Sequence, residues 1–249
     1  TVASNVLALY VIALRGHFSS IAAHLISASI LSAPAALAMS KILLPEKQRP
    51  ETLGFNVEPH YTRESNVFEA VINGANAGVK LIAGIVALLI AVLGLVALVD
   101  LFLRWTGGVL RLPPGLEANW SLSGILGYVF YPFALVIGIP VADAAEVASL
   151  IGMRAIETEV PAYFALGELI GEGGLLHRRS YVIAAYALCG FAHVASMAIF
   201  IGGVSALAPS KTRELSEVGL RALIAATLAC LMTACVAGTF FADNSILLR

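Results

Sequence analysis

Three long stretches without a charged side chain limit what this chain can fold into. They run from Leu81 to Val99, from Ser180 to Ser210 and from Ala222 to Ala242, and His193 is the one histidine within them. A helix of about 20 apolar residues crosses the roughly 30 Å of hydrocarbon in a bilayer. Charged residues make up 12% of the chain, whereas soluble domains carry about 25%. The sequence therefore predicts an all-α, polytopic integral membrane protein.

Several other classes of protein find no support in the residues. The net charge is −1 and the basic residues form no cluster, which argues against nucleic-acid binding. The sequence contains no Gly-x-Ser-x-Gly, His-Glu-x-x-His, phosphate-loop or dinucleotide signature, so we expect neither an enzyme nor a cofactor. Its cysteines, at 189, 230 and 235, lie in apolar runs without a Cys-x-x-Cys spacing. That placement favours packing over a zinc site or a disulfide.

The chain begins inside an apolar segment. Thr1, Ser4 and Asn5 place three polar side chains at its opening, a weak signal that also fits a chain end with no special role. Because this first apolar helix looks truncated, we expect that the sequence is the C-terminal part of a longer protein.

The apolar runs, prolines and charges divide the chain into segments. We expect two helices in 1–44 (the first truncated), a loop in 45–65, an amphipathic lead-in and a membrane helix in 66–105, a connector and an interfacial helix in 106–139, a hairpin in 140–170, and two helices in 180–249 separated by a charged loop at 210–218. Gly127, Pro132 and Gly138 interrupt the apolar stretch around them, which favours an interfacial position for it.

The hairpin segment holds our principal functional candidate. Its apolar halves, Val141–Ile156 and Val160–Leu169, are each too short to span a bilayer, and Glu157, Thr158 and Glu159 lie between them. We therefore predict a re-entrant helical hairpin, whose non-helical tip is tolerated at membrane depth only inside protein or beside a wet cavity. A carboxylate at that depth usually faces a cavity, a partner or a substrate.

The break beside Glu159 strengthens this interpretation. Pro161 follows it closely, and discontinuous membrane helices of this kind line transport sites. The alternative is a soluble loop between two surface helices, but the apolar run from Val160 to Leu166 disfavours it. For Glu157 the alternative to a binding role is a position that faces only the water-filled entrance to the site.

A second candidate lies in the middle of the 180–210 run. Gly190 and its small neighbours predict local unwinding, and the freed backbone groups would then bond a ligand, an ion or water. Phe191 could stack on a flat ring, and His193 and Ser196 share one helical face. The alternative is a buried histidine bonded to a neighbouring helix. His193 with Glu159 could imitate an acid–base pair, but no nucleophile or metal set accompanies them.

An ordered series of short motifs runs along the chain. The series comprises His24–Ser29 with Ser32–Leu37, Lys41 with Pro45-Glu46, Asn73-Gly74-Ala75 with Gly78, Leu126-Gly127-Tyr128, Gly138-Ile139-Pro140, Leu150–Arg154, Glu159 with Ala162-Tyr163, Cys189–Ala192 and Leu207-Ala208-Pro209. In these segments the chain resembles the concentrative nucleoside transporters over nearly its whole length.

The resemblance implies a trimeric nucleoside importer, driven by sodium or protons, with an elevator-type transport domain. In that family the second half holds a scaffold helix, a re-entrant hairpin and two transport-domain helices. The first half contributes base-recognition and sodium-binding groups, and we expect that half to be missing from this sequence.

The resemblance also implies roles for individual residues. By position, Glu159 resembles the hairpin glutamate that binds ribose hydroxyls, Phe191 the aromatic beside the nucleoside, Ser196 a ribose-contacting serine, Val6 the small apolar residue near the base, and Thr1 and Val2 the unwound segment that helps to bind sodium. Two positions depart from the pattern. His193 and Thr158 each stand where the family has an asparagine, and a histidine there favours proton sensitivity.

We therefore expect cation-coupled symport of nucleosides, with Na⁺ or H⁺ as the coupling ion, in a bacterial inner (plasma) membrane. Glu159, Ser196 and His193 would contact the sugar and Phe191 would pack on the nucleoside. Two alternatives stay open: a homologous carrier for a different small polar solute, and a non-transporting membrane subunit that uses the fold for assembly.

Overall fold

The computed structural model describes residues 4–47, 64–110 and 120–242, and all regular structure in these ranges is helical. The helices are α1 (Ser4–Leu14), α2 (Ile21–Leu43), α3 (Val67–Leu110), α4 (Leu122–Val136), α5 (Val141–Ile156), α6 (Glu159–Gly171), α7 (Arg178–Leu188), α8 (Val194–Leu207) and α9 (Thr212–Thr239), with a 3₁₀ turn η1 (Pro209–Lys211) before α9. The predicted all-α membrane fold is confirmed.

Three of the described helices are long and apolar enough to cross a membrane. They are α2, α3 and the η1–α9 unit. α3 is the extreme case, because no residue in its most apolar 18-residue stretch is buried inside the structure. Side chains such as Val86, Leu95 and Phe102 are about half exposed or more. Apolar surface of this extent is what a bilayer covers.

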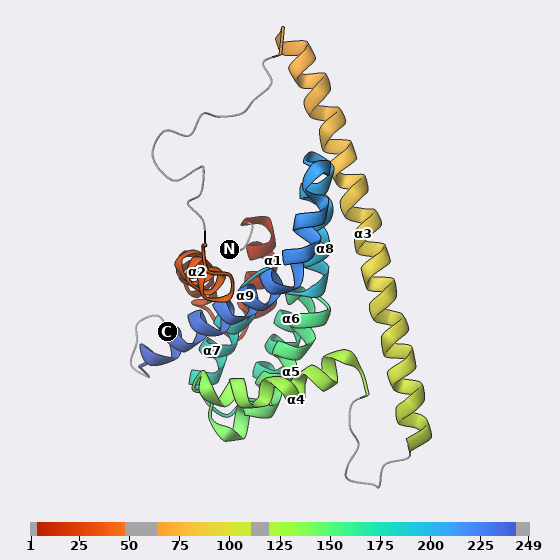
Figure 1. The fold of residues 1–249 in the computed structure, drawn as a ribbon. Helices are drawn as coiled ribbons and strands as arrows, with labels where there is room; N and C mark the ends of the chain where they lie inside the picture. Colours follow the sequence, from red (N-terminus) through yellow and green to blue (C-terminus); the bar gives the residue numbers. More distant parts are fainter. Residues whose placement is uncertain (1–3, 48–63, 111–119, 243–249) are drawn as a thin grey trace.

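α3 stands at the side of the molecule and runs along α8 (Figure 1). Small residues allow the two backbones to approach closely. A methyl group placed on Gly202 would lie 3.3 Å from the carbonyl oxygen of Gly84, and one on Gly84 would lie 3.7 Å from that of Gly202. Close approach through small residues is the usual basis of helix association in membranes.

The core lies where α5, α6 and α7 meet. α7 is the most enclosed element, with Ser180 and all seven residues from Val182 to Leu188 buried. α4 packs tightly against α5, because a Cβ on Gly152 would come within 2.5 Å of the Gly127 nitrogen. The interruption that the sequence analysis noted at Gly127 is therefore a contact point between helices.

Two helix boundaries differ from expectation. α3 is one continuous helix that ends at Leu110, past the expected end at 105. The expected charged loop at 210–218 is wrong, because α9 already begins at Thr212. Its charges form helical pairs: Arg213 lies 3.0 Å from Glu217, four residues on. Ion pairs at this spacing stabilise a solvated turn of helix.

Candidate functional site

The hairpin turns between Ile156 and Glu159, through Glu157 and Thr158 alone. Glu157 ends α5 and Thr158 is extended, with φ −157° and ψ 172°. Glu159 is the first residue of α6, where a carboxylate interacts favourably with the helix dipole. Pro161 lies in the same first turn, where its missing N–H leaves no hydrogen bond unmade. The local sequence thus sets a carboxylate at a helix N-terminus.

Glu159 is buried, with 2% of its surface exposed. The hydroxyl of Tyr10 on α1 donates a hydrogen bond to its Oε1, with the oxygens 2.5 Å apart. Its Oε2 lies 2.8 Å from Nε2 of His193, which immediately precedes α8. The side chain therefore joins three separate segments, α1, α6 and the start of α8.

His193 is fixed as the N-cap of α8 by a reciprocal pair of hydrogen bonds. Its Nδ1 accepts from the backbone N–H of Ser196 at 2.9 Å, and Ser196 Oγ accepts from the backbone N–H of His193 at 3.0 Å. Because Nδ1 is an acceptor, the ring proton of neutral His193 is on Nε2. The nitrogen that faces Glu159 is therefore a donor.

Unsatisfied polar atoms gather around this pair. Seven buried side-chain N or O atoms of the described residues have no hydrogen-bond partner, and five of them belong to Arg154, Glu159 and His193. Glu159 Oε2 and His193 Nε2 lie 2.8 Å apart, as in an ion pair, yet their geometry does not amount to a hydrogen bond. Buried polar atoms normally have partners, so both atoms can still bond a further group.

Phe191 lies in the break between α7 and α8, which the sequence analysis anticipated at Gly190. A Cβ on Gly190 would lie 2.4 Å from Cys230 Sγ, so only glycine lets the broken segment lie against α9. The Phe191 ring meets the imidazole of His193 edge-on, with centroids 4.9 Å apart. The predicted unwinding thus brings an aromatic ring beside the Glu159–His193 pair.

An apolar groove of about 320 Å³ runs between α8 and α9 and begins at Phe191 and Ser196. Met197, Phe200 and other apolar side chains continue its lining. Glu159 and His193 do not line this groove, but it reaches the pair through Phe191, whose ring meets the imidazole of His193.

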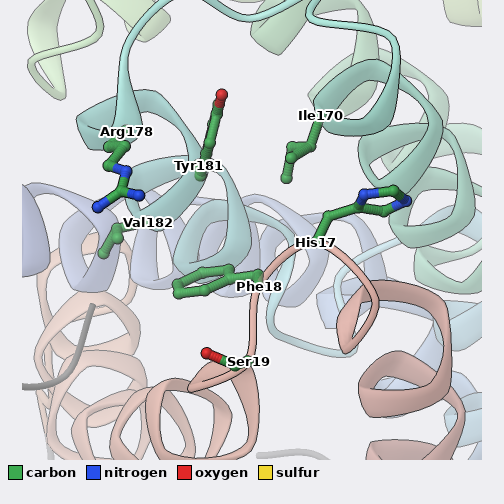
Figure 2. Close-up of a pocket in the computed structure, with 7 residues that line it drawn as sticks. All are labelled: His17, Phe18, Ser19, Ile170, Arg178, Tyr181 and Val182. Carbon is green, nitrogen blue, oxygen red and sulfur yellow. The ribbon is translucent and has the colours of Figure 1, made fainter. Parts of the chain in front are cut away.

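A larger pocket of about 530 Å³ lies elsewhere, at the α1–α2 turn and the start of α7 (Figure 2). Neither Glu159 nor His193 lines it. Figure 2 shows His17 and Arg178 on opposite sides of it, with Phe18 between them. Because its polar groups do not converge, we do not take it as the functional site.

The remaining predicted site residues are less central. Val6 is half-buried, packs against the core and lies one helical turn before Tyr10. Ser196 is buried, and besides its capping bond its hydroxyl donates to the carbonyl of His193 at 2.6 Å. Glu157 is exposed. Thr1 and Val2 lie outside the described residues.

Sequence reasoning missed Tyr10. It is fully buried, and its ring stacks on Tyr163, with centroids 4.2 Å apart and planes 19° from parallel. Tyr163 is in turn held by a hydrogen bond from its hydroxyl to the Ala185 carbonyl, at 2.7 Å. The one available signal was a tyrosine placed four residues after Val6 on an otherwise apolar helix.

Asp143, also missed, lies at the base of the hairpin and is fully buried. It accepts hydrogen bonds from the Ser180 hydroxyl (2.5 Å), the Leu176 N–H (2.9 Å), and both the backbone N–H and Nδ1 of His177 (3.1 and 3.0 Å). Burial alone would raise the pKa of Asp143, but these bonds outweigh it and hold that pKa below its ordinary value. The network clamps α5 to the start of α7.

Comparison with known proteins agrees with this architecture. Residues 24–238 match the family model described as "Na+ dependent nucleoside transporter C-terminus". Solute carrier family 28 member 3 of Eptatretus stoutii is 39% identical over 97% of this chain and 36% of its own length. Sodium/nucleoside cotransporter 1 of Rattus norvegicus is 34% identical over 99% of this chain and 38% of its own length.

A solved structure is similar over nearly the whole chain. A double mutant of CNTnw in an outward-facing state superposes with a TM-score of 0.82 at 31% identity, covering 96% of this chain and 55% of that one. The chain thus spans little more than a third of the two curated relatives and about half of the solved one. On these matches, the chain belongs to the Na⁺-dependent nucleoside transporter family, an integral plasma-membrane family of transporters rather than enzymes.

Proposed function

We propose that this chain carries the sugar-binding part of a secondary transporter that imports nucleosides with a coupling cation. The observation that carries the proposal is the pairing of Glu159 with His193. A buried carboxylate at a hairpin tip faces a ring N–H at a helix break, 2.8 Å away, and neither atom has an aligned hydrogen bond. Buried ionisable groups of this kind mark substrate sites in membrane proteins.

The chemistry of the pair selects its ligand. His193 Nε2 is a donor and Glu159 Oε2 is an acceptor, so one group that both accepts and donates can bridge them. A hydroxyl does this, whereas a carbonyl cannot donate and an ammonium cannot accept. The site therefore fits a neutral hydroxylated solute, and a ribose hydroxyl satisfies both atoms at once.

The neighbouring surface accommodates the rest of a nucleoside. The Phe191 ring lies beside the imidazole, and the apolar groove extends from it. A nucleobase is flat and can stack on such a ring. Ser196 holds the break in shape through its capping bonds and has one lone pair left for a sugar hydroxyl, while Val6 lies one turn before Tyr10 on α1.

Several finer features form part of the same proposal. The relatives named as sodium/nucleoside cotransporters support Na⁺ as the coupling ion, with Thr1 and Val2 among its ligands, and H⁺ is the alternative. The α5–α6 hairpin would re-enter the membrane and move with α7 and α8 as an elevator, while α3 would belong to a trimeric scaffold in a bacterial inner membrane. Ion binding would raise substrate affinity through a coupling free energy, commonly about 1–3 kcal/mol.

Uptake of radiolabelled uridine by a nucleoside-auxotrophic host tests the proposal. A hydrogen bond to a charged group contributes about 1.5–3 kcal/mol, so Glu159→Gln should lower uptake by roughly ten- to a hundredfold. Glu157→Gln is the matched control, since it removes an exposed carboxylate from the same tip and should leave uptake unchanged. Normal uptake by Glu159→Gln would refute the assigned role.

The same assay separates the alternatives. His193 replaces the amide that the resemblance leads one to expect, which favours a carrier for a different small polar solute as the second candidate. In that case labelled uridine would not accumulate, whereas another labelled polyol or polar solute would. A wild-type protein that assembles in the membrane and moves no solute would instead be a non-transporting subunit.

A further inference from the structure

Arg154 is a buried cation that has no role in the proposed sugar contacts or in the hydrogen bonds described above. It lies in the last turn of α5 and has no exposed surface. All three of its guanidinium nitrogens lack a hydrogen-bond partner among the described residues. Arginine is rarely buried without a paired group, because an uncompensated charge in the interior is strongly unfavourable.

Arg154 lies beside the candidate site. It precedes the two-residue tip and Glu159 follows it. The turn between the two residues' helices is only two residues long, and α5 and α6 pack against each other. Charges interact strongly across several ångströms in a medium of low dielectric constant, even without direct contact. Arg154 and Glu159 contribute one positive and one negative charge to the cluster.

The other titratable groups around the cluster do not supply this positive charge. α1 contributes Tyr10, α6 contributes Tyr163, the end of α7 contributes Cys189, and α4 has only tyrosines at 128 and 131. The acidic residues of α5, at 143 and 146, lie toward its other end, with the nearer of them about 12 Å from Arg154 at 1.5 Å per residue. His193 accepts the backbone N–H of Ser196 with its Nδ1 in the cap of α8.

We propose that Arg154 is a positioning residue whose unpaired charge keeps the Glu159 carboxylate ionised in its dry pocket, ready to accept a substrate hydroxyl. This inference rests on the proposed function. Within the part of the chain that the structure describes, the guanidinium makes no hydrogen bond, so the fold gains little from it beyond the packing of the side chain. A structural role and an electrostatic role therefore predict different outcomes.

Equilibrium binding of uridine to the intact purified protein, measured from pH 4 to 9 without an ion gradient, tests the inference. In Arg154→Met the carboxylate loses a nearby positive charge, so it takes up a proton at higher pH. The pH at which binding is half-lost should move upward by about one unit. Arg154→Lys keeps the charge and should keep the wild-type profile, as should Glu146→Gln, which removes an exposed charge from the same helix.

Thermal unfolding of the same samples in detergent separates the two roles. The melting temperature of Arg154→Met should stay close to that of the wild type, because methionine keeps much of the packing and Glu159 can take up a proton once the positive charge is gone. An unshifted pH profile in Arg154→Met overturns the inference. If the melting temperature also falls, the role of Arg154 is structural. If that variant is not recovered folded, the same profile is measured on Arg154→Gln with the same criterion. A wild type that binds no nucleoside at any pH would refute the proposed function itself, and the inference with it.

Discussion

The hairpin carries two buried carboxylates whose surroundings differ sharply. Asp143, at its base, accepts four hydrogen bonds from the segment that begins α7. Glu159, at its tip, accepts one hydrogen bond from Tyr10 and keeps its other oxygen unsatisfied beside His193. Burial alone therefore does not mark a functional acid. The distinguishing property is the unused bonding capacity, which is absent at the base and present at the tip.

Removal of the base carboxylate should give the largest effect on stability. Asp143→Ala leaves the Ser180 hydroxyl and two backbone N–H groups without their acceptor, and breaking a buried ionic network costs about 3–5 kcal/mol. Thermal unfolding in detergent measures the loss. Glu146→Ala, an exposed carboxylate on the same helix, is the control. A stability change no larger than that of Glu159→Gln would remove the contrast between base and tip.

Loss of the Tyr10 hydroxyl should weaken binding more than it weakens the fold. Tyr10→Phe keeps the ring stack on Tyr163 but removes the donor that orients Glu159, worth about 1.5–3 kcal/mol. The KM for uridine uptake should rise by about tenfold or more. In the matched variant Tyr163→Phe, which loses only a bond to a backbone carbonyl, the KM should stay near that of the wild type. Equal effects in both variants would contradict a specific role for Tyr10.

The cap of α8 should make a smaller contribution. Ser196→Ala removes the hydroxyl that bonds the His193 backbone but leaves the bond from the Ser196 N–H to the imidazole. We expect a loss of about 1 kcal/mol in the free energy of unfolding. Ser216→Ala, an exposed serine on α9, should change it by less than about 0.5 kcal/mol. A Ser196→Ala variant as stable as the wild type would argue against the capping box.

Acid should weaken the base of the hairpin. The pKa of Asp143 is lower in the folded chain than in an unfolded one. Its contribution to stability is therefore fully present above the ordinary aspartate pKa of about 3.9 and disappears as the pH falls through the lower folded value. Melting temperatures from pH 6 down to pH 3 measure this loss. In Asp143→Asn the same component should be missing, and an identical acid profile would exclude Asp143 as its source.

Much of the architecture could be predicted because bilayer length is a strong constraint. Uncharged runs indicate membrane helices, and two halves too short to span predict a hairpin with its turn at Glu157–Glu159. Gly190 marked the break because glycine is needed where the chain closely approaches Cys230. Whether the hairpin re-enters the membrane stays a prediction, since that depends on the position of the bilayer.

The contacts that complete the site could not be predicted in the same way. Tyr10 and Glu159 are 149 positions apart, and no local pattern encodes a bond over that distance. Arg154 lies in the last turn of α5, where a basic residue is ordinary in any helix. Asp143 opens α5, where an acidic residue is equally ordinary. The charges near Thr212 suggest a solvated loop, but Arg213 and Glu217 are four residues apart, a spacing that equally suits a helix.

The imidazole of His193 caps the first turn of α8, and its other nitrogen faces the pocket proposed to bind the sugar. A ligand that rotated this ring would leave the Ser196 amide without its acceptor, so the start of α8 would fray. α8 is also the helix that lies along α3. Occupancy of the pocket and the integrity of a helix end against the long outer helix are therefore linked through a single aromatic side chain, with no hinge needed between them.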